Sequence, residues 1–136
     1  MTEDQVFDRV VDVFMRLYGT RFFDWLGDDG NGFTEDCADI LNRNHWVGEE
    51  VAALRELKAR GALARLAPLM EDPNPVVRTQ AATACLALTT DKALPILESA
   101  GKGIFGRGPG EDFEVWSAQN ALNNWRTGKP VIWGVV

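Results

Sequence analysis

Long apolar stretches are missing from this sequence, and their absence excludes several classes of protein. The 136 residues contain no run of about eighteen apolar residues, so we expect no membrane-spanning helix. The N-terminus carries Glu3, Asp4 and Asp8 where a signal peptide would have a basic flank and an apolar block, which predicts a cytoplasmic protein. Hydrophobic residues make up 46% and charged residues 25%, as is typical of one globular domain.

Residues that commonly carry chemistry are also scarce. The two cysteines, Cys37 and Cys85, are too few and too far apart for a disulfide framework or a zinc site, and they fit a reducing compartment. His45 is the only histidine, and Glu49, one helical turn away, is the sole neighbour with metal-binding chemistry. A nucleophilic pair of Cys37 and His45 would require the tertiary structure to bring them together. We therefore predict no catalytic residue, no metal site and no cofactor.

Basic charge is in deficit, and the deficit is uneven along the chain. The net charge of −6 argues against nucleic-acid binding, because phosphate contacts need clustered lysine and arginine. Residues 1–50 hold twelve acidic and four basic residues, whereas residues 51–136 hold eight and ten. This acidic half is either a solubilising surface or a face that steers a basic partner. The candidate steering residues are Asp28, Asp29, Glu35 and Asp36.

What the sequence does contain is helical periodicity along most of its length. A capping box of Thr2 and Gln5 opens a first amphipathic helix, which should end at Gly19. A possible strand is confined to the apolar tail, residues 131–136. The fold class is therefore all-α, with about six to seven helices in a single domain. It divides into an N-terminal helix and acidic loop (1–33), helical repeats (34–130) and the tail. Further helices are predicted over residues 34–46, 49–60, 63–70, 75–88, 91–100 and 112–126.

An internal repeat links two of the predicted helices. When the sequence is shifted by 37 residues, four apolar residues of the helix after Pro75 align with four apolar residues of the last predicted helix. Each set follows another helix with leucine or isoleucine at helical spacing. Helix pairs at a near-constant period predict an α-solenoid, in which each pair buries its apolar face by stacking on its neighbours. The aligned positions are Ala81, Ala84, Cys85 and Leu88 with Ala118, Ala121, Leu122 and Trp125.

Residues 69–82 resemble the HEAT-repeat signature. An Asp ends one helix, a proline turn follows, and an Arg lies six residues after the Asp; here these are Asp72, Pro75 and Arg78. Over residues 40–130 the chain is similar to a family of small bacterial HEAT-like proteins catalogued as a domain of unknown function. The resemblance implies a short right-handed α-solenoid of HEAT-like helix pairs, in which Asp72 and Arg78 help tie neighbouring repeats. It assigns no chemistry, although proteins of this size and shape recur as immunity proteins beside bacterial toxins.

Two glycine-rich segments resemble ligand-binding loops only in part. Residues 101–106 match G-x-G-x-x-G, but a helix precedes them where a dinucleotide site needs a strand. This segment is better interpreted as a mobile loop between two helices. The alternative is a contact loop that presents Lys102, Arg107 and the pair Ile104 and Phe105. Residues 27–38 would need carboxylates at both ends to form a calcium loop, and Gly27 and Ala38 occupy those positions.

The last predicted helix carries the strongest candidate binding site. Opposite its apolar stripe lies a face of two large aromatics and four amides, a composition typical of interface centres. The alternative is that the tail folds back, so that Ile132 and Trp133 cover the aromatics. The face consists of Phe113, Trp116, Gln119, Asn120, Asn123 and Asn124.

These features favour a non-enzymatic protein-binding module. Its most concrete form is an immunity protein that masks a bacterial toxin, which makes the partner a basic toxin domain. The alternative is a HEAT-like adaptor or regulatory scaffold with an unrelated protein partner. A nucleic-acid enzyme would need a basic groove that the charge count does not predict. The sequence leaves the oligomeric state open.

Overall fold

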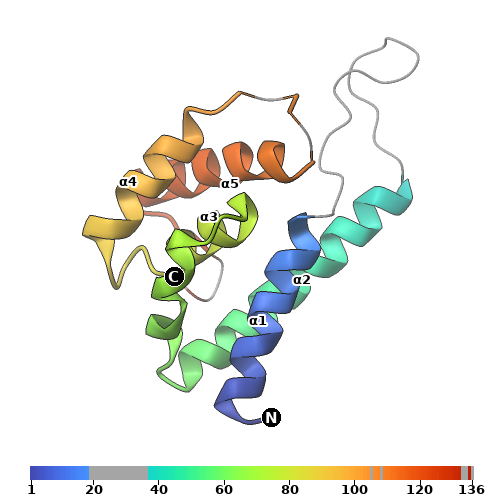
Figure 1. Cartoon of the computed structure of the whole chain (residues 1–136), viewed down its shortest axis with the longest axis vertical. Helices are drawn as coiled ribbons and strands as arrows, with labels where there is room; N and C mark the ends of the chain where they lie inside the picture. The colour runs from blue at the N-terminus through green and yellow to red at the C-terminus, as the bar shows by residue number, and fades with distance from the viewer. Residues whose placement is uncertain (19–36, 105, 108, 133–134, 136) are drawn as a thin grey trace.

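The described part of the chain is helical throughout. The computed structural model describes residues 1–18, 37–104, 106–107, 109–132 and 135 (Figure 1). These residues form five α-helices and one 3-10 helix and contain no strand, which confirms the all-α prediction. The elements are α1 (Glu3–Tyr18), α2 (Cys37–Ala59), η1 (Leu63–Glu71), α3 (Pro75–Ala84), α4 (Thr90–Gly101) and α5 (Pro109–Arg126).

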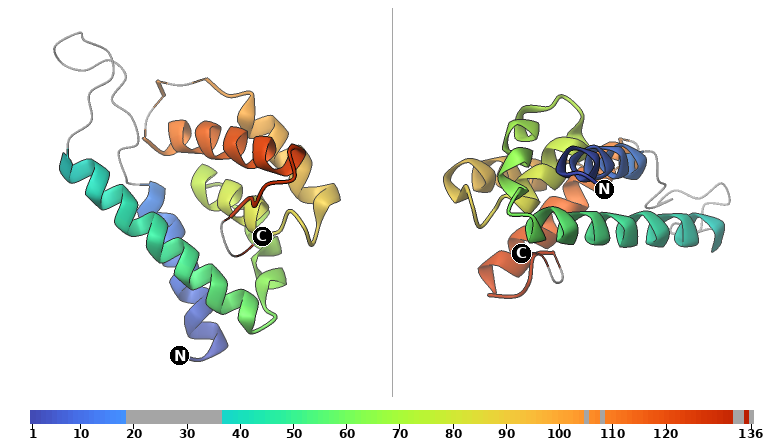
Figure 2. Two further views of the ribbon diagram at one scale, coloured as in Figure 1. Left: turned by 180° about the vertical axis from the view of Figure 1, so that it is seen from behind. Right: turned by 90° about the horizontal axis from the view of Figure 1, so that it is seen from below.

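The helices are arranged as two pairs with α3 between them. One pair is α1 with α2 and the other is α4 with α5, and the members of each pair lie side by side (Figures 1 and 2). The short helix α3 contacts η1, α1, α4 and α5. It is almost entirely buried, which explains why small residues occupy so many of its positions. None of the helices in these ranges has the length and apolar character needed to traverse a lipid bilayer.

Several helix ends form where the sequence predicts them. The Thr2 amide donates a hydrogen bond to Gln5 Oε1 (2.8 Å) and the Gln5 amide donates to Thr2 Oγ1 (3.2 Å), which confirms the capping box. Pro75 lies in the first turn of α3 as expected, and the Asn74 side chain caps that helix. Gly61 ends α2 with φ +68, a backbone conformation that glycine adopts without strain.

The predicted break between residues 46 and 49 is wrong, because α2 runs without interruption from Cys37 to Ala59. Gly48 lies within this stretch. One glycine inside a helix costs only about 1 kcal/mol relative to alanine. The packing of α2 against α1 outweighs that cost.

The helices around the proline turn also differ from the prediction. Residues 63–71 form a 3-10 helix, and Pro68 within it has no N–H for an α-helical hydrogen bond. Helix α3 ends at Ala84 instead of continuing to residue 88. The hydroxyls of Thr89 and Thr90 bond the carbonyls of Cys85 and Leu86, which stabilises a turn there. Leu88, predicted to be in the core, is consequently 55% exposed.

The core consists of a large cluster and a small one. The large cluster draws on all six helices and on two residues of the tail, Ile132 and Val135. The small cluster contains Val13, Leu17, Val76 and Phe113, with Trp46 packed against it. The alternative in which Ile132 covers Phe113 is therefore wrong, since these residues belong to different clusters; Trp133 lies outside the described residues.

Candidate functional site

Helix α5 presents four of the six predicted site residues to solvent. Trp116, Gln119, Asn120 and Asn123 are all exposed, and their i, i+3, i+4, i+7 spacing places them in one stripe. Trp116 is 37% exposed and is one of few large apolar side chains on the described surface. We call these four residues the α5 stripe.

Phe113 does not belong to this surface, and the prediction that it does is wrong. Its side chain is only 2% exposed and packs with Val13 and Leu17 of α1. Helix α1 covers the N-terminal part of α5, and helical periodicity alone does not reveal such a neighbour. The Phe113 and Trp116 ring centroids lie 6.3 Å apart. The buried Phe113 ring therefore packs beside the exposed Trp116 ring. Asn124, at the edge of the predicted face, is half-buried.

A polar depression borders the α5 stripe where α4 and α5 meet. It has a volume of about 490 Å³, and Gln119 and Asn123 line it. Gln119 Nε2 donates a hydrogen bond to the Gly101 carbonyl oxygen (2.9 Å), which fixes this amide against the end of α4. Arg126 at its edge pairs with Glu98 at 3.8 Å. The stripe therefore combines an exposed aromatic with amides that offer both donors and acceptors.

The four acidic candidates Asp28, Asp29, Glu35 and Asp36 lie outside the described residues. Within the described part of the N-terminal half, several acidic groups are paired with arginine. Arg65 contacts Glu3 and Asp4 at 3.3 and 2.8 Å. Arg9 contacts Glu49 at 2.8 Å, and this hydrogen bond lowers the pKa of Glu49.

The predicted repeat signature forms contacts, but not all of those expected. Arg78 donates to the main-chain carbonyl of Asp72 (3.3 Å), whereas the Asp72 carboxylate accepts from the Asn74 amide (2.8 Å). The Arg78 guanidinium also pairs with Glu114 of α5 at 3.2 Å. Arg78 therefore links α3 to α5, while Asp72 stabilises the turn before α3. Pro75 opens α3.

The residues considered for nucleophilic chemistry are not assembled into a site. Cys85 is buried, and burial raises the pKa of its thiol to about 11, which disfavours the reactive thiolate. His45 is exposed, and its ring contacts Trp46 edge-on at 4.8 Å between centroids. The Cys37 side chain lies outside the described residues. Among the side chains that the structure describes, no three histidine, cysteine or carboxylate groups gather to hold a metal ion.

The glycine-rich loop uses its backbone donors internally. The N–H groups of Gly106 and Arg107 donate to Asp112 Oδ1, at 2.7 and 3.2 Å. A phosphate would need such donors to be free, and here a carboxylate of the same chain occupies them. Lys102, Ile104 and Arg107 are exposed, as a contact loop requires; Phe105 lies outside the described residues.

A buried polar chain crosses the core, and the sequence analysis missed it. Gln80 of α3 donates to Glu50 of α2 (2.6 Å) and accepts from the Ser117 hydroxyl of α5 (2.7 Å). Glu50 is only 6% exposed, and its desolvation raises the carboxyl pKa to about 7. A signal was present, because Glu50 falls on the same helical face as the buried Ala53, Leu54 and Leu57.

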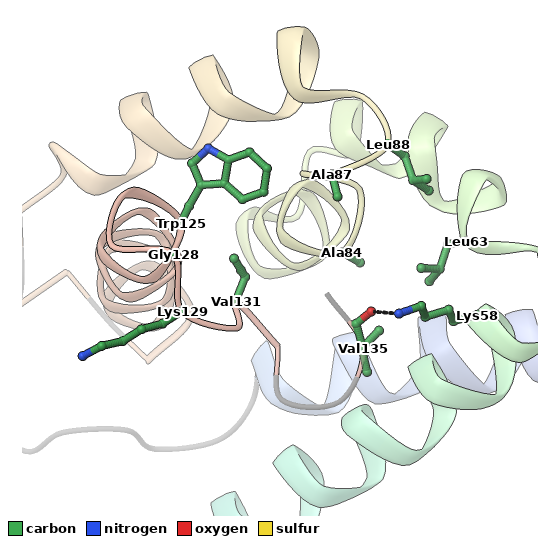
Figure 3. Close-up of a pocket in the computed structure, with 10 residues that line it drawn as sticks. All are labelled: Lys58, Leu63, Ala84, Ala87, Leu88, Trp125, Gly128, Lys129, Val131 and Val135. Atoms are coloured by element: carbon green, nitrogen blue, oxygen red, sulfur yellow. Dashed lines mark hydrogen bonds between the residues drawn. The ribbon is translucent and has the colours of Figure 1, made fainter.

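A second missed feature is an apolar pocket between the tail, α3, α5 and η1. Its volume is about 450 Å³ (Figure 3). Trp125 and Val131 line one side in Figure 3, and Ala84, Ala87, Leu88 and Leu63 line the other. The Lys58 ammonium reaches the pocket and donates a hydrogen bond to the Val135 carbonyl oxygen. The pocket exists because α3 ends early and because the tail returns to the core.

Comparison of the chain with models of protein families, with curated proteins and with solved structures found no match.

Proposed function

We propose that this protein is a non-enzymatic protein-binding module, a short right-handed α-solenoid of HEAT-like helix pairs that recognises another protein through the α5 stripe. The observation that carries the proposal is the exposed Trp116 among Gln119, Asn120 and Asn123. Tryptophan supplies contact area at little entropic cost, and neighbouring amides adapt their hydrogen bonds to a partner.

Contacts between α3 and α5 support the solenoid. Under the 37-residue shift Gln80 corresponds to Ser117, and these two side chains are joined by a hydrogen bond of 2.7 Å. In stacked repeats the second helices of successive pairs lie against each other, so equivalent positions come into contact. The pairs would be η1 with α3 and α4 with α5, both of which are in contact.

The chemistry of the described side chains supports a binding role over catalysis. The Cys85 thiol has a raised pKa and is buried, and two backbone donors of the glycine-rich loop, those of Gly106 and Arg107, are bonded to Asp112. Glu50, whose carboxyl pKa is raised, is buried in the core and lines none of the described pockets. A general acid or base must reach the substrate, and Glu50 does not.

The most concrete form of the proposal is an immunity protein whose partner is a basic bacterial toxin domain. The support is the acidic N-terminal half, with twelve acidic against four basic residues in positions 1–50. Opposite charge raises the rate of encounter and disfavours acidic competitors, while the aromatic and amide contacts hold the complex. Asp28, Asp29, Glu35 and Asp36 would act in the encounter step. The protein would use no cofactor and bind no nucleic acid.

Co-purification from the native host with two matched baits tests this function. We expect the wild-type chain to retain a basic protein, and the Trp116→Ala chain to bind that protein about thirtyfold more weakly, the effect of losing an interface hot spot. Leu88→Ala is the control, because Leu88 is also an exposed apolar residue but lies on another surface. Neutralisation of the captured protein's toxicity by co-expression completes the test.

The outcomes separate the candidate functions. A captured protein that is toxic to cells and neutralised by co-expression supports immunity. A captured housekeeping protein that depends on Trp116 supports the adaptor alternative instead. Equal binding by the Trp116→Ala and Leu88→Ala chains would contradict the α5 stripe as the docking surface.

A further inference from the structure

The apolar pocket of Figure 3 has the size and the walls of a small-molecule site. Its volume of about 450 Å³ lies within the range of about 300–1,000 Å³ typical of ligand pockets. Trp125 and Val131 form one wall, and Ala84, Ala87 and Leu88 form the facing one. The Leu88 side chain is 55% exposed here, so apolar surface remains in contact with water. A ligand with an apolar body would remove that surface from water.

Lys58 gives this apolar pocket a cationic anchor. In Figure 3 its ammonium points toward the Val135 carbonyl oxygen, to which it donates a hydrogen bond. The side chain of Lys129, by contrast, points away from the pocket. Among the residues that line the pocket in the described ranges there is no carboxylate. An ammonium has three donors, so Lys58 can bond an anion while it keeps its bond to Val135.

We propose that this pocket binds a medium-chain aliphatic carboxylate, with the carboxylate on Lys58 Nζ and the chain between Trp125 and Ala87. The anionic group matches the Lys58 ammonium, the positive charge that faces the cavity among the described lining residues, and a charge-assisted hydrogen bond of this kind is stronger than a neutral one. The aliphatic chain matches the alanine, leucine and valine side chains that make up most of the described walls, among which the Trp125 indole N–H is the further side-chain donor and the Lys129 ammonium points away. A cationic ligand would meet the like charge of Lys58, and a neutral one would leave its positive charge unmatched.

This site is separate from the α5 stripe, so the two proposals fail independently. The stripe consists of Trp116, Gln119, Asn120 and Asn123, and none of them lines this pocket. The Trp116→Ala chain should therefore bind a carboxylate as the wild type does. The pocket variants, in turn, should capture the protein partner as the wild type does.

Titration of the full chain with octanoate, followed by NMR of alanine and valine methyl groups, tests the proposal. We expect saturable shifts at Ala84, Ala87 and Val131, and an affinity that rises about fourfold per methylene from hexanoate to octanoate. Octan-1-ol and octylammonium are the matched neutral and cationic probes, and both should bind more weakly. Lys58→Gln should weaken octanoate binding about tenfold and leave octan-1-ol binding unchanged.

Two further variants keep the test decisive. Lys92→Gln removes an exposed lysine of α4 that does not line the pocket, and it should leave octanoate binding unchanged. Ala87→Phe fills the pocket from an exposed position and should abolish binding of both octanoate and octan-1-ol. The proposal is overturned if octanoate binds no better than octylammonium, if Lys58→Gln and Lys92→Gln behave alike, or if the shifts lie elsewhere.

Discussion

Glu50 is a carboxyl group that folding removes from water. Burial raises its pKa from 4.5 to about 7, and the hydrogen bond from Gln80 only partly opposes this shift. In the folded chain the protonated carboxyl of Glu50 therefore predominates below about pH 7. Because the folded pKa lies above the unfolded one, the contribution of Glu50 to stability is complete below pH 4.5 and is lost as the pH rises through about 7.

We expect Glu50→Gln to flatten this pH dependence. The wild-type free energy of unfolding should lose about 3 kcal/mol through Glu50 between pH 4.5 and pH 8, the cost of a shift of this size. Glutamine keeps an oxygen that can accept from Gln80 and carries no charge at either pH. The variant should consequently be more stable than the wild type at pH 8. Urea unfolding at both pH values measures the difference.

The matched control for this experiment is Glu56→Gln. Glu56 also lies on α2, but it is exposed and pairs with Arg60 at 2.8 Å. Its replacement should leave the slope of stability against pH between 4.5 and 8 close to that of the wild type. A Glu50→Gln chain that kept the wild-type slope would show that the carboxyl is hydrated in the folded protein.

Among the helices, the ends that depend on local chemistry were predictable and those that depend on neighbours were not. The cap at Thr2, the stop at Gly61 and the start at Pro75 each follow from one or two residues. The continuity of α2 through Gly48 instead depends on packing against α1. The early end of α3 depends on Thr89 and Thr90, whose hydroxyls bond the carbonyls of Cys85 and Leu86 in the turn that follows the helix.

Two glycines of different elements should respond in opposite directions to replacement by alanine. At Gly103, after α4, an added Cβ would lie 2.6 Å from Val115 Cγ2 of α5, so Gly103→Ala should cost about 1–3 kcal/mol of stability. At Gly48, inside α2, nothing lies within 4 Å, so Gly48→Ala should stabilise by about 1 kcal/mol through helix propensity. Thermal unfolding of both variants against the wild type provides the measurement. A stabilising Gly103→Ala would mean that α4 and α5 pack less closely than described.

For the molecule as a whole, the sequence predicted the all-α class and all four residues of the α5 stripe, but it also predicted Phe113 on the same surface, where it does not lie. Trp116, Gln119, Asn120 and Asn123 followed from periodicity alone, because a helix with one buried side exposes the other. The burial of Phe113 required knowledge of where α1 crosses α5. The apolar pocket required the positions of the tail and of η1, which lie far apart in sequence.

The excess of acidic residues in positions 1–50 predicts how salt affects association with the proposed basic partner. The association rate constant should fall about tenfold when NaCl is raised from 50 to 500 mM, because salt screens the attraction that steers the encounter. The dissociation rate constant should change less, since the contacts of the α5 stripe are short-ranged. Stopped-flow or surface-based kinetics at the two salt concentrations measures both constants. An association rate that is independent of salt would contradict steering by the acidic half.

The small core cluster has a consequence for synthesis of the chain on the ribosome. It joins Val13 and Leu17, made early, to Phe113, made a hundred residues after Val13. At a translation rate of about 5–20 residues per second, Phe113 is synthesised several seconds after Val13 and Leu17, the α1 residues that it covers in the folded chain. During that interval the described elements that contact α1 are α2, η1 and α3. A nascent-chain chaperone would therefore find its target in the apolar face of α1 rather than in α5.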